Sequence, residues 1–222
     1  MWVFHRSSIE ARWGPAENLG QPVNSMAADY CPTPLRGKWL LFVSTRPGGC
    51  CGGDMYLARN DPAHGWSVEH LGCAVDGSAE FPGWRVGPSL VETAEGTLLK
   101  FSSDGFDVGG DQDIYVSLRG PDGTFGAPAL VAELSTPAHD FMPNVRKDGR
   151  EIVFNSNRGG PGSFGGQDVY SSTRASTSDP WSAPVNLGAA VNTAGNETRS
   201  SLSWDGRRLH FGRDGDIFVS IR

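Results

Sequence analysis

Short runs of alternating hydrophobic and polar residues recur along the chain, separated by turns rich in glycine. Residues 113–119 (DIYVSLR) and 151–157 (EIVFNSN) place β-branched and aromatic residues at alternate positions. This period of two is typical of β-strands that bury one face. No window of about 11 residues shows a convincing helical period. The pattern therefore predicts an all-β protein.

The strand pattern recurs four times, which indicates a repeat architecture. Each period holds about four strands: one begins near a proline, one is an LxF run, one follows an aspartate, and one contains a tryptophan or phenylalanine. Four-stranded antiparallel units that repeat every ~40–60 residues around an axis describe a β-propeller. A flat array of hairpins would also fit, but every unit would then leave exposed strand edges. The aromatic residue of the fourth strand marks each period, at Trp13, Trp66, Phe125 and Trp181.

The two ends of the chain are irregular. Residues 1–20 resemble the third and fourth strands of a blade that lacks its first two, and the last blade stops after its third strand. Either residues 13–20 supply the missing fourth strand and close a four-bladed ring, or the chain is a shortened five-bladed propeller. The expected organisation is one domain over residues 1–222, with a partial blade at 1–20 and blades approximately at 27–73, 84–134, 138–188 and 196–222.

Four phrases recur at matching positions of the repeats. They are NLGxxVN (18–24 and 186–192), DxxP (29–32 and 140–143), Ser-x-Arg followed by a glycine pair (44–49 and 156–160) and GGxDVY (165–170). On these phrases the chain resembles the TolB-type, WD-repeat-like β-propeller proteins of bacteria over essentially its whole length. The resemblance implies the propeller fold, and the usual five repeats favour the shortened five-bladed closure. Related repeats occur in envelope proteins and in peptidase-associated propellers, so the resemblance implies little about activity.

Composition narrows the possible functions. The 19 basic and 25 acidic residues give a formal net charge of −6, and no basic run forms the footprint that a duplex-binding protein needs. No apolar run approaches the ~20 residues of a membrane span. There is no GxSxG phrase and no phosphate-binding GxxxxGK(S/T). We therefore expect a monomer that has no cofactor, metal or membrane span and binds no nucleic acid.

The inner strand of each blade opens on a charged residue, three positions before its proline or the equivalent serine. In a propeller these residues lie on the face where ligands commonly bind over the central channel. They could form a ring that binds a charged or sugar ligand, and paired carboxylates are also what glycoside hydrolysis uses. Alternatively, each acid pairs with an arginine of its own or an adjacent blade as part of the repeat. The candidates are Asp29, Arg85, Asp140 and Glu197 on the inner strands, with Arg46 and Arg158 after the second strands; Arg85 alone breaks the acidic pattern.

Other polar residues fit structural roles better. An aspartate opens the third strand of every complete blade, where it can fix a turn through its own backbone. A Ca²⁺ site is conceivable where several aspartates crowd one turn, but their spacing is not that of an EF-hand loop. The histidines lack metal-ligand spacing and are expected to be solvated. These residues are Asp54, Asp113, Asp168 and Asp216; Asp104, Asp107 and Asp111; and His64, His70 and His139.

The four cysteines fall within one blade. Cys50, Cys51 and Cys73 are expected near one face of it, and Cys31 opens its inner strand. Without CxxC spacing, a disulfide of Cys73 with Cys50 or Cys51 is favoured over a zinc site. The alternative is that the cysteines are small buried hydrophobic residues. A disulfide would indicate an oxidising compartment.

Three functions remain in competition. The favoured one is a non-enzymatic binding or scaffold module that presents its loop face to a protein or a cell-envelope glycan. The alternative is a glycan-directed hydrolase that uses carboxylates at the channel mouth, and a third is the non-catalytic domain of a split peptidase. The resemblance and the cysteines favour a periplasmic or extracellular location, whereas the first residues show no secretory signal, so a cytoplasmic location stays open.

Overall fold

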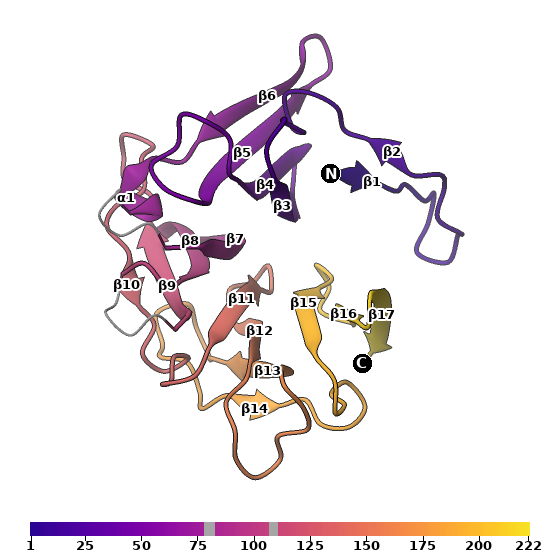
Figure 1. Cartoon of the computed structure of the whole chain (residues 1–222), viewed down its shortest axis with the longest axis vertical. Coiled ribbons are helices and arrows are strands. Elements are labelled where there is room, and N and C mark those ends of the chain that lie inside the picture. The colour runs from indigo at the N-terminus through magenta and orange to yellow at the C-terminus, as the bar shows by residue number, and fades with distance from the viewer. Residues whose placement is uncertain (78–82, 107–110) are drawn as a thin grey trace.

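The chain forms a β-propeller whose blades are arranged in a ring (Figure 1). The computed structural model describes residues 1–77, 83–106 and 111–222. Apart from one short helical turn, α1 (Cys73–Asp76), its regular elements are strands. The prediction of an all-β propeller is confirmed. None of the helical structure in these ranges is long or apolar enough to cross a membrane.

Four sheets make up the ring, and we number them blades 1 to 4 in chain order. In each blade the strands are antiparallel and follow one another from the inner to the outer edge. Blade 1 holds β3 (Asp29–Leu35), β4 (Trp39–Ser44), β5 (Asp54–Asp61) and β6 (Gly65–His70); blade 2 holds β7 (Arg85–Thr93), β8 (Gly96–Ser103), β9 (Asp113–Leu118) and β10 (Ala129–Leu130); blade 3 holds β11 (Asp140–Val145), β12 (Glu151–Ser156), β13 (Asp168–Thr173) and β14 (Val185–Asn186); blade 4 holds β15 (Glu197–Leu202), β16 (Arg208–Arg213) and β17 (Asp216–Ile221).

The N-terminal segment forms a separate two-stranded sheet. Strand β1 (Trp2–Val3) pairs with β2 (Glu17–Asn18), and the sheet lies in the ring between blade 1 and blade 4 (Figure 1). In the described part of the chain, β17 pairs with β16 alone. Residues 13–20 therefore do not serve as the fourth strand of blade 4. The side chains of Ile217 and Ile221 on β17 stay exposed.

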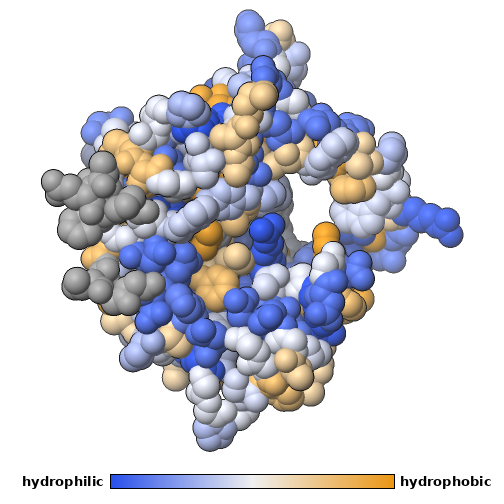
Figure 2. Space-filling model, in the orientation of Figure 1, coloured by the Kyte–Doolittle hydropathy of each residue, from blue (hydrophilic) through white to orange (hydrophobic). Residues whose placement is uncertain are grey.

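Every inner strand carries a β-bulge two residues after its first residue. The residue there has a positive φ: 51° at Cys31, 61° at Gly87, 54° at Met142 and 53° at Arg199. Gly87 is needed for a second reason, because a Cβ there would lie 2.3 Å from the Cα of Met142 in the next blade. The bulge at Gly87 thus lets the inner strands of blades 2 and 3 approach closely. Figure 2 shows an opening in the ring on the side where Figure 1 has the N-terminal sheet and blade 4.

The blades share one aromatic motif in their cores. A phenylalanine on the second strand stacks on an aromatic ring of the third strand, since these residues sit opposite each other in the antiparallel register. The ring centroids are 5.7 Å apart for Phe42–Tyr56, 6.2 Å for Phe101–Tyr115, 6.1 Å for Phe154–Tyr170 and 5.8 Å for Phe211–Phe218. The stacked pair gives each blade a flat apolar surface that another side chain can cover.

Candidate functional site

Blades 1, 3 and 4 each hold a buried acid–arginine pair at the start of the inner strand. The acid opens the inner strand, and the arginine ends or follows the second strand, so antiparallel pairing brings the two side chains together. The arginine also lies over the stacked aromatic pair of its own blade. The nitrogen–oxygen distances are 2.7 Å for Arg46–Asp29, 2.5 Å for Arg158–Asp140 and 2.8 Å for Arg213–Glu197.

The carboxylates of these pairs are saturated with hydrogen-bond donors. In blade 3, Asp140 accepts bonds from Arg158 and from both the backbone N–H and the hydroxyl of Thr136. Ser25 and Thr193 repeat the role of Thr136 in blades 1 and 4. Burial alone would raise the pKa of Asp29, but hydrogen bonds from Ser44 and Arg46 outweigh it and lower that pKa.

In blades 1, 3 and 4 the predicted ring of charges thus consists of ion pairs within each blade. Asp140 and Glu197 are fully buried, and Asp29 is nearly so. The structural interpretation of the sequence, in which each acid pairs with an arginine of its own blade, matches these contacts. The sequence analysis did not identify Arg213 as a site residue. Its position directly after the LxF-like run of the second strand could have indicated it.

Blade 2 departs from this arrangement. Arg85 takes the place of the acid, and its guanidinium is fully buried. Its Nη1 contacts Cys51 Sγ at 3.2 Å and the carbonyl of Gly83, while its Cζ lies 5.0 Å from the ring centre of Phe106. Gly105 stands where blades 1 and 3 have arginine, and a Cβ on it would lie only 3.0 Å from Arg85 Nη2. Among the described residues, Arg85 Nε and Nη2 have no hydrogen-bond partner.

The cysteines and His70 gather beside this position, at the same end of blade 1. The structure pairs Cys50 with Cys73, one of the two pairings that the sequence left open. His70 Nε2 lies 2.9 Å from Asp76 Oδ2 and 3.8 Å from Asp54 Oδ1, and both carboxylates are fully buried. The carboxylates of Asp54 and Asp76 raise the pKa of His70 to about 9. The expectation of a solvated His70 was wrong, because the end of β6 carries it over these acids.

Two of the four third-strand aspartates fix turns as expected. Asp54 accepts the backbone N–H groups of Cys50 and Cys51, and Asp168 accepts those of Phe164 and Gly165. Of the aspartates weighed for Ca²⁺, Asp107 lies outside the described residues. Asp104 accepts the backbone N–H of Trp84, and Asp111 pairs with His139 at 3.3 Å.

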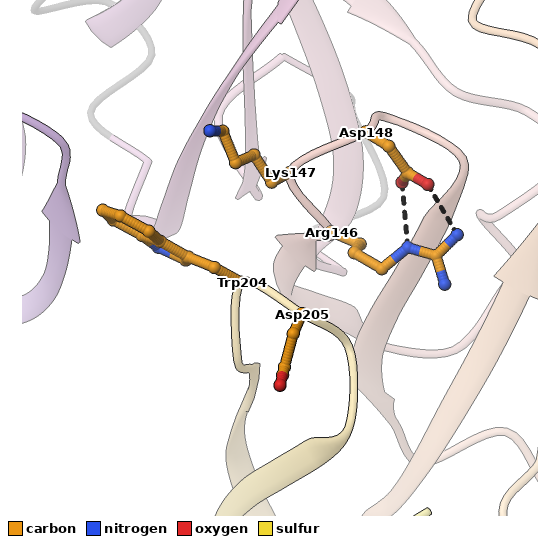
Figure 3. A pocket seen from close by; sticks show the side chains of 5 residues that line it. All are labelled: Arg146, Lys147, Asp148, Trp204 and Asp205. Atoms are coloured by element: carbon orange, nitrogen blue, oxygen red, sulfur yellow. Dashed lines mark hydrogen bonds and ion pairs between the residues drawn. The ribbon is translucent and has the colours of Figure 1, made fainter. Parts of the chain in front are cut away.

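A cavity of about 360 Å³ opens at the opposite end of the strands. It lies between the β11–β12 turn and the β15–β16 turn, and Trp204 extends into it toward Lys147 (Figure 3). We call it the Trp204 pocket. Arg36 from the β3–β4 turn also approaches the Trp204 ring, at 5.3 Å from its centre. The lining residues are Arg146, Lys147, Asp148, Trp204 and Asp205.

The pKa values of both carboxylates of the Trp204 pocket are lowered. A two-bond pairing with Arg146, seen in Figure 3, lowers the pKa of Asp148 to about 2. Hydrogen bonds from Ser203 and the backbone of Arg207 lower the pKa of Asp205. Both side chains are therefore anions at neutral pH, and Trp204 presents an indole that is 54% exposed. The sequence interpretation missed this pocket, although an aromatic residue before an Asp-Gly turn was its signal.

Comparisons with known proteins identify the fold. No protein-family model matches the sequence, and no curated protein matches it significantly. An exo-1,5-α-L-arabinanase from a bovine ruminal metagenomic library matches at a TM-score of 0.58 with 12% identity, over 95% of this chain and 86% of the other. An α-L-arabinofuranosidase of Lactobacillus brevis gives 0.57 and 13% over 90% and 75%. A TolB-assigned protein of Agrobacterium tumefaciens gives 0.52 and 20% over 92% and 60%. At these identities the similarity shows the β-propeller fold.

Proposed function

We propose that this chain is a glycan-directed β-propeller that binds a polysaccharide at the Trp204 pocket. The observation that carries the proposal is the half-exposed Trp204 indole in a cavity of about 360 Å³ lined by charged side chains. A sugar ring has an apolar face that packs on an indole and hydroxyl groups that bond to charged neighbours. Lys147 supplies donors and Asp205 supplies acceptors for such hydroxyls.

Hydrolysis of a glycan is the second candidate, and the fold comparisons favour it. The matched arabinanase and arabinofuranosidase are enzymes that act on arabinose-containing glycans. A glycosidase needs one carboxyl group with a raised pKa as its acid and a second carboxylate nearby. Asp148 and Asp205, whose pKa values are lowered, do not supply that acid, and Asp140 and Glu197 are bound by arginines of their own blades. Pocket chemistry thus ranks binding ahead of cleavage.

One experiment separates the two candidates. The purified chain is mixed with arabinan, arabinoxylan and peptidoglycan fragments; binding is followed by tryptophan fluorescence and calorimetry, and cleavage by the release of reducing ends. We expect saturable binding of at least one glycan without cleavage, and at least a roughly tenfold loss of affinity in Trp204→Ala. Trp84→Ala is the matched control, because Trp84 is 51% exposed at the other end of the strands.

Each outcome decides between the candidates. Cleavage by the wild-type chain would replace the binding proposal with hydrolysis. A loss of affinity in Trp84→Ala, with Trp204→Ala unchanged, would move the ligand to the face that the sequence predicted. If the chain neither binds nor cleaves any of these glycans, both candidates fail.

The family and the location complete the proposal. The recurring NLGxxVN and Ser-x-Arg phrases and the match to a TolB-assigned structure support a TolB-type repeat. The Cys50–Cys73 disulfide supports a periplasmic or extracellular site of action, since such bonds persist in oxidising compartments. Both assignments agree with a protein that meets polysaccharides outside the cytoplasm.

A further inference from the structure

Blade 1 and blade 3 carry different residues at one equivalent place. In blade 3, Asn192 Nδ2 donates to Asn186 Oδ1 at 2.7 Å, and Asn192 Oδ1 accepts the N–H of Val169 on the third strand. These neutral amides belong to the NLGxxVN phrase and join the outer strand to its neighbour.

The corresponding phrase of blade 1 is HLGCAVD, at residues 70–76. His70 stands for Asn186, Asp76 stands for Asn192, and Cys73 stands for an alanine. Asp76 Oδ1 still accepts the third-strand N–H, that of Met55, at 3.0 Å. The backbone role is thus preserved, while three side chains have become the types that bind transition metals.

The side chains of this place converge on one point. Atoms of Cys50, Asp54 and His70 that can ligate a metal lie within 4.8 Å of one another. The separations are 3.8 Å from His70 Nε2 to Asp54 Oδ1 and 4.0 Å from His70 Nε2 to Cys50 Sγ. Ligands of a tetrahedral zinc ion lie roughly 3.3–3.8 Å apart, given its usual bond lengths. The two His70 separations are within a few tenths of an ångström of this range, whereas the widest separation in the group, up to 4.8 Å, would have to close by about 1 Å.

A second observation also points to a cation. Asp76 and Asp54 are both fully buried, and His70 Nε2 lies 2.9 Å from Asp76 Oδ2 and 3.8 Å from Asp54 Oδ1. The Oδ2 of Asp54 has no hydrogen-bond donor among the described residues. Two buried carboxylates thus face one imidazole, which can balance only one of the two negative charges, and a further cation would balance the other.

We propose that reduction of the Cys50–Cys73 disulfide creates a zinc site in blade 1, with Cys50 Sγ, Asp54 Oδ1 and His70 Nε2 as ligands. A dithiol reductant transfers two electrons and two protons to the S–S bond, which yields two thiols and leaves the reductant as its own disulfide. Zinc then displaces two protons to solvent, one from the Cys50 thiol and one from His70 Nε2, and binds the thiolate and the neutral imidazole. Asp76 Oδ2, beside His70 Nε2, is placed for the fourth position. Cys51 is not chosen, because its Sγ contacts Arg85.

The site would hold the β4–β5 turn, which carries Cys50, to the end of β6, which carries His70. The disulfide ties the same turn to Cys73, three residues beyond β6. Zinc and the disulfide are therefore alternative cross-links for the β4–β5 turn. The disulfide holds this turn in the oxidised chain, and zinc holds it in the reduced chain.

The test measures zinc affinity of the full chain before and after reduction with a phosphine, by competition with a chromophoric chelator. Cobalt replaces zinc in a parallel titration, where a thiolate ligand gives an intense charge-transfer band. We expect one zinc per reduced chain, and binding at least roughly tenfold weaker in the oxidised chain and in reduced His70→Asn. His70→Asn introduces the residue that stands at the equivalent position of blade 3, Asn186, so the substitution is compatible with the fold. Circular dichroism confirms folding of each form.

Two cysteine variants form the decisive pair, because both remove the same disulfide. Cys73→Ala leaves Cys50 as a free thiol, and we expect it to bind zinc without any reductant. Cys50→Ala is expected to bind at least roughly tenfold more weakly, reduced or not. Equal affinity in the two variants, equal affinity of the oxidised and reduced chains, or a cobalt complex without the thiolate band would overturn the proposal. His64→Asn, on an exposed turn, is expected to change nothing.

Discussion

Blade 3 and blade 2 cover their stacked aromatic pairs with different side chains. In blade 3, Asp140 pairs with Arg158, whose guanidinium covers the stacked rings of Phe154 and Tyr170. In blade 2, Phe106 packs against the equivalent rings, Phe101 and Tyr115, at centroid distances of 6.2 and 5.0 Å. The aromatic surface of the blade is covered in both cases, once by a paired cation and once by a third ring.

The difference teaches which part of the repeat is essential. Covering the aromatic pair is common to both blades, whereas the ion pair is one means of doing so. Blade 2 is left with Arg85, a buried cation that faces a thiol and a carbonyl where Arg158 faces a carboxylate. We therefore expect replacement of Arg158 to cost much more stability than replacement of Arg85, and three predictions measure how far the blades differ.

The largest effect is expected for Asp140→Asn in blade 3. The substitution leaves Arg158 largely buried without its anion, and breaking one partner of a buried pair typically costs about 3–5 kcal/mol. The free energy of unfolding should fall by that amount in urea denaturation followed by circular dichroism. Asp61→Asn is the control, because Asp61 pairs with His64 on an exposed turn. A loss below about 1 kcal/mol would show that the pair is not a structural element.

The second prediction concerns Lys100 on the second strand of blade 2, where blade 3 has Val153. Lys100 is 2% exposed, and burial, with the charge of Arg174 adding to it, lowers its pKa from 10.5 to about 8. Below pH 8 the folded chain must hold this buried ammonium, whereas the unfolded chain holds it in water. Lys100 therefore causes no loss of stability above pH 10.5, where it is neutral in both states. The loss develops as the pH falls from 10.5 and is complete below pH 8.

Replacement of Lys100 by methionine should remove that penalty. At pH 7 the variant is expected to be more stable by up to about 3 kcal/mol, since each pKa unit corresponds to about 1.4 kcal/mol. The advantage should shrink steadily between pH 8 and 10. Other groups that titrate there, including Cys51, are present in both proteins and cancel in the difference. A constant difference across this range would mean that Lys100 is not desolvated in solution.

The repeat explains why the sequence predicts the fold and the acid–arginine pairs so well. Antiparallel pairing places the first residue of one strand beside the end of the next, so Asp140 and Arg158 can be matched from their spacing alone. The Trp204 pocket and the His70 cluster are different. The Trp204 pocket depends on how close the turns of two blades come, as Lys147 does to Trp204, and the His70 cluster depends on how the β4–β5 turn of blade 1 folds against the end of β6. No period in the sequence reports either distance. The β-bulges were also missed, because Cys31 and Met142 give no sign of a positive φ.

The smallest effect is expected for Arg85→Met in blade 2. The guanidinium is fully buried with Nε and Nη2 unpaired among the described residues, so removing it relieves a desolvation cost. The loss of its bond to the Gly83 carbonyl acts in the opposite direction, by about 1–3 kcal/mol if that carbonyl stays buried. These opposing terms should leave the free energy of unfolding within about 1 kcal/mol of wild type, whereas Arg158→Met in blade 3 should lose several times more because it strands the buried Asp140. Urea denaturation of both variants under one set of conditions gives the comparison directly. If Arg85→Met loses as much as Arg158→Met, the guanidinium of Arg85 has an anionic partner in the folded chain, and blade 2 keeps the ion pair of its neighbours in another form.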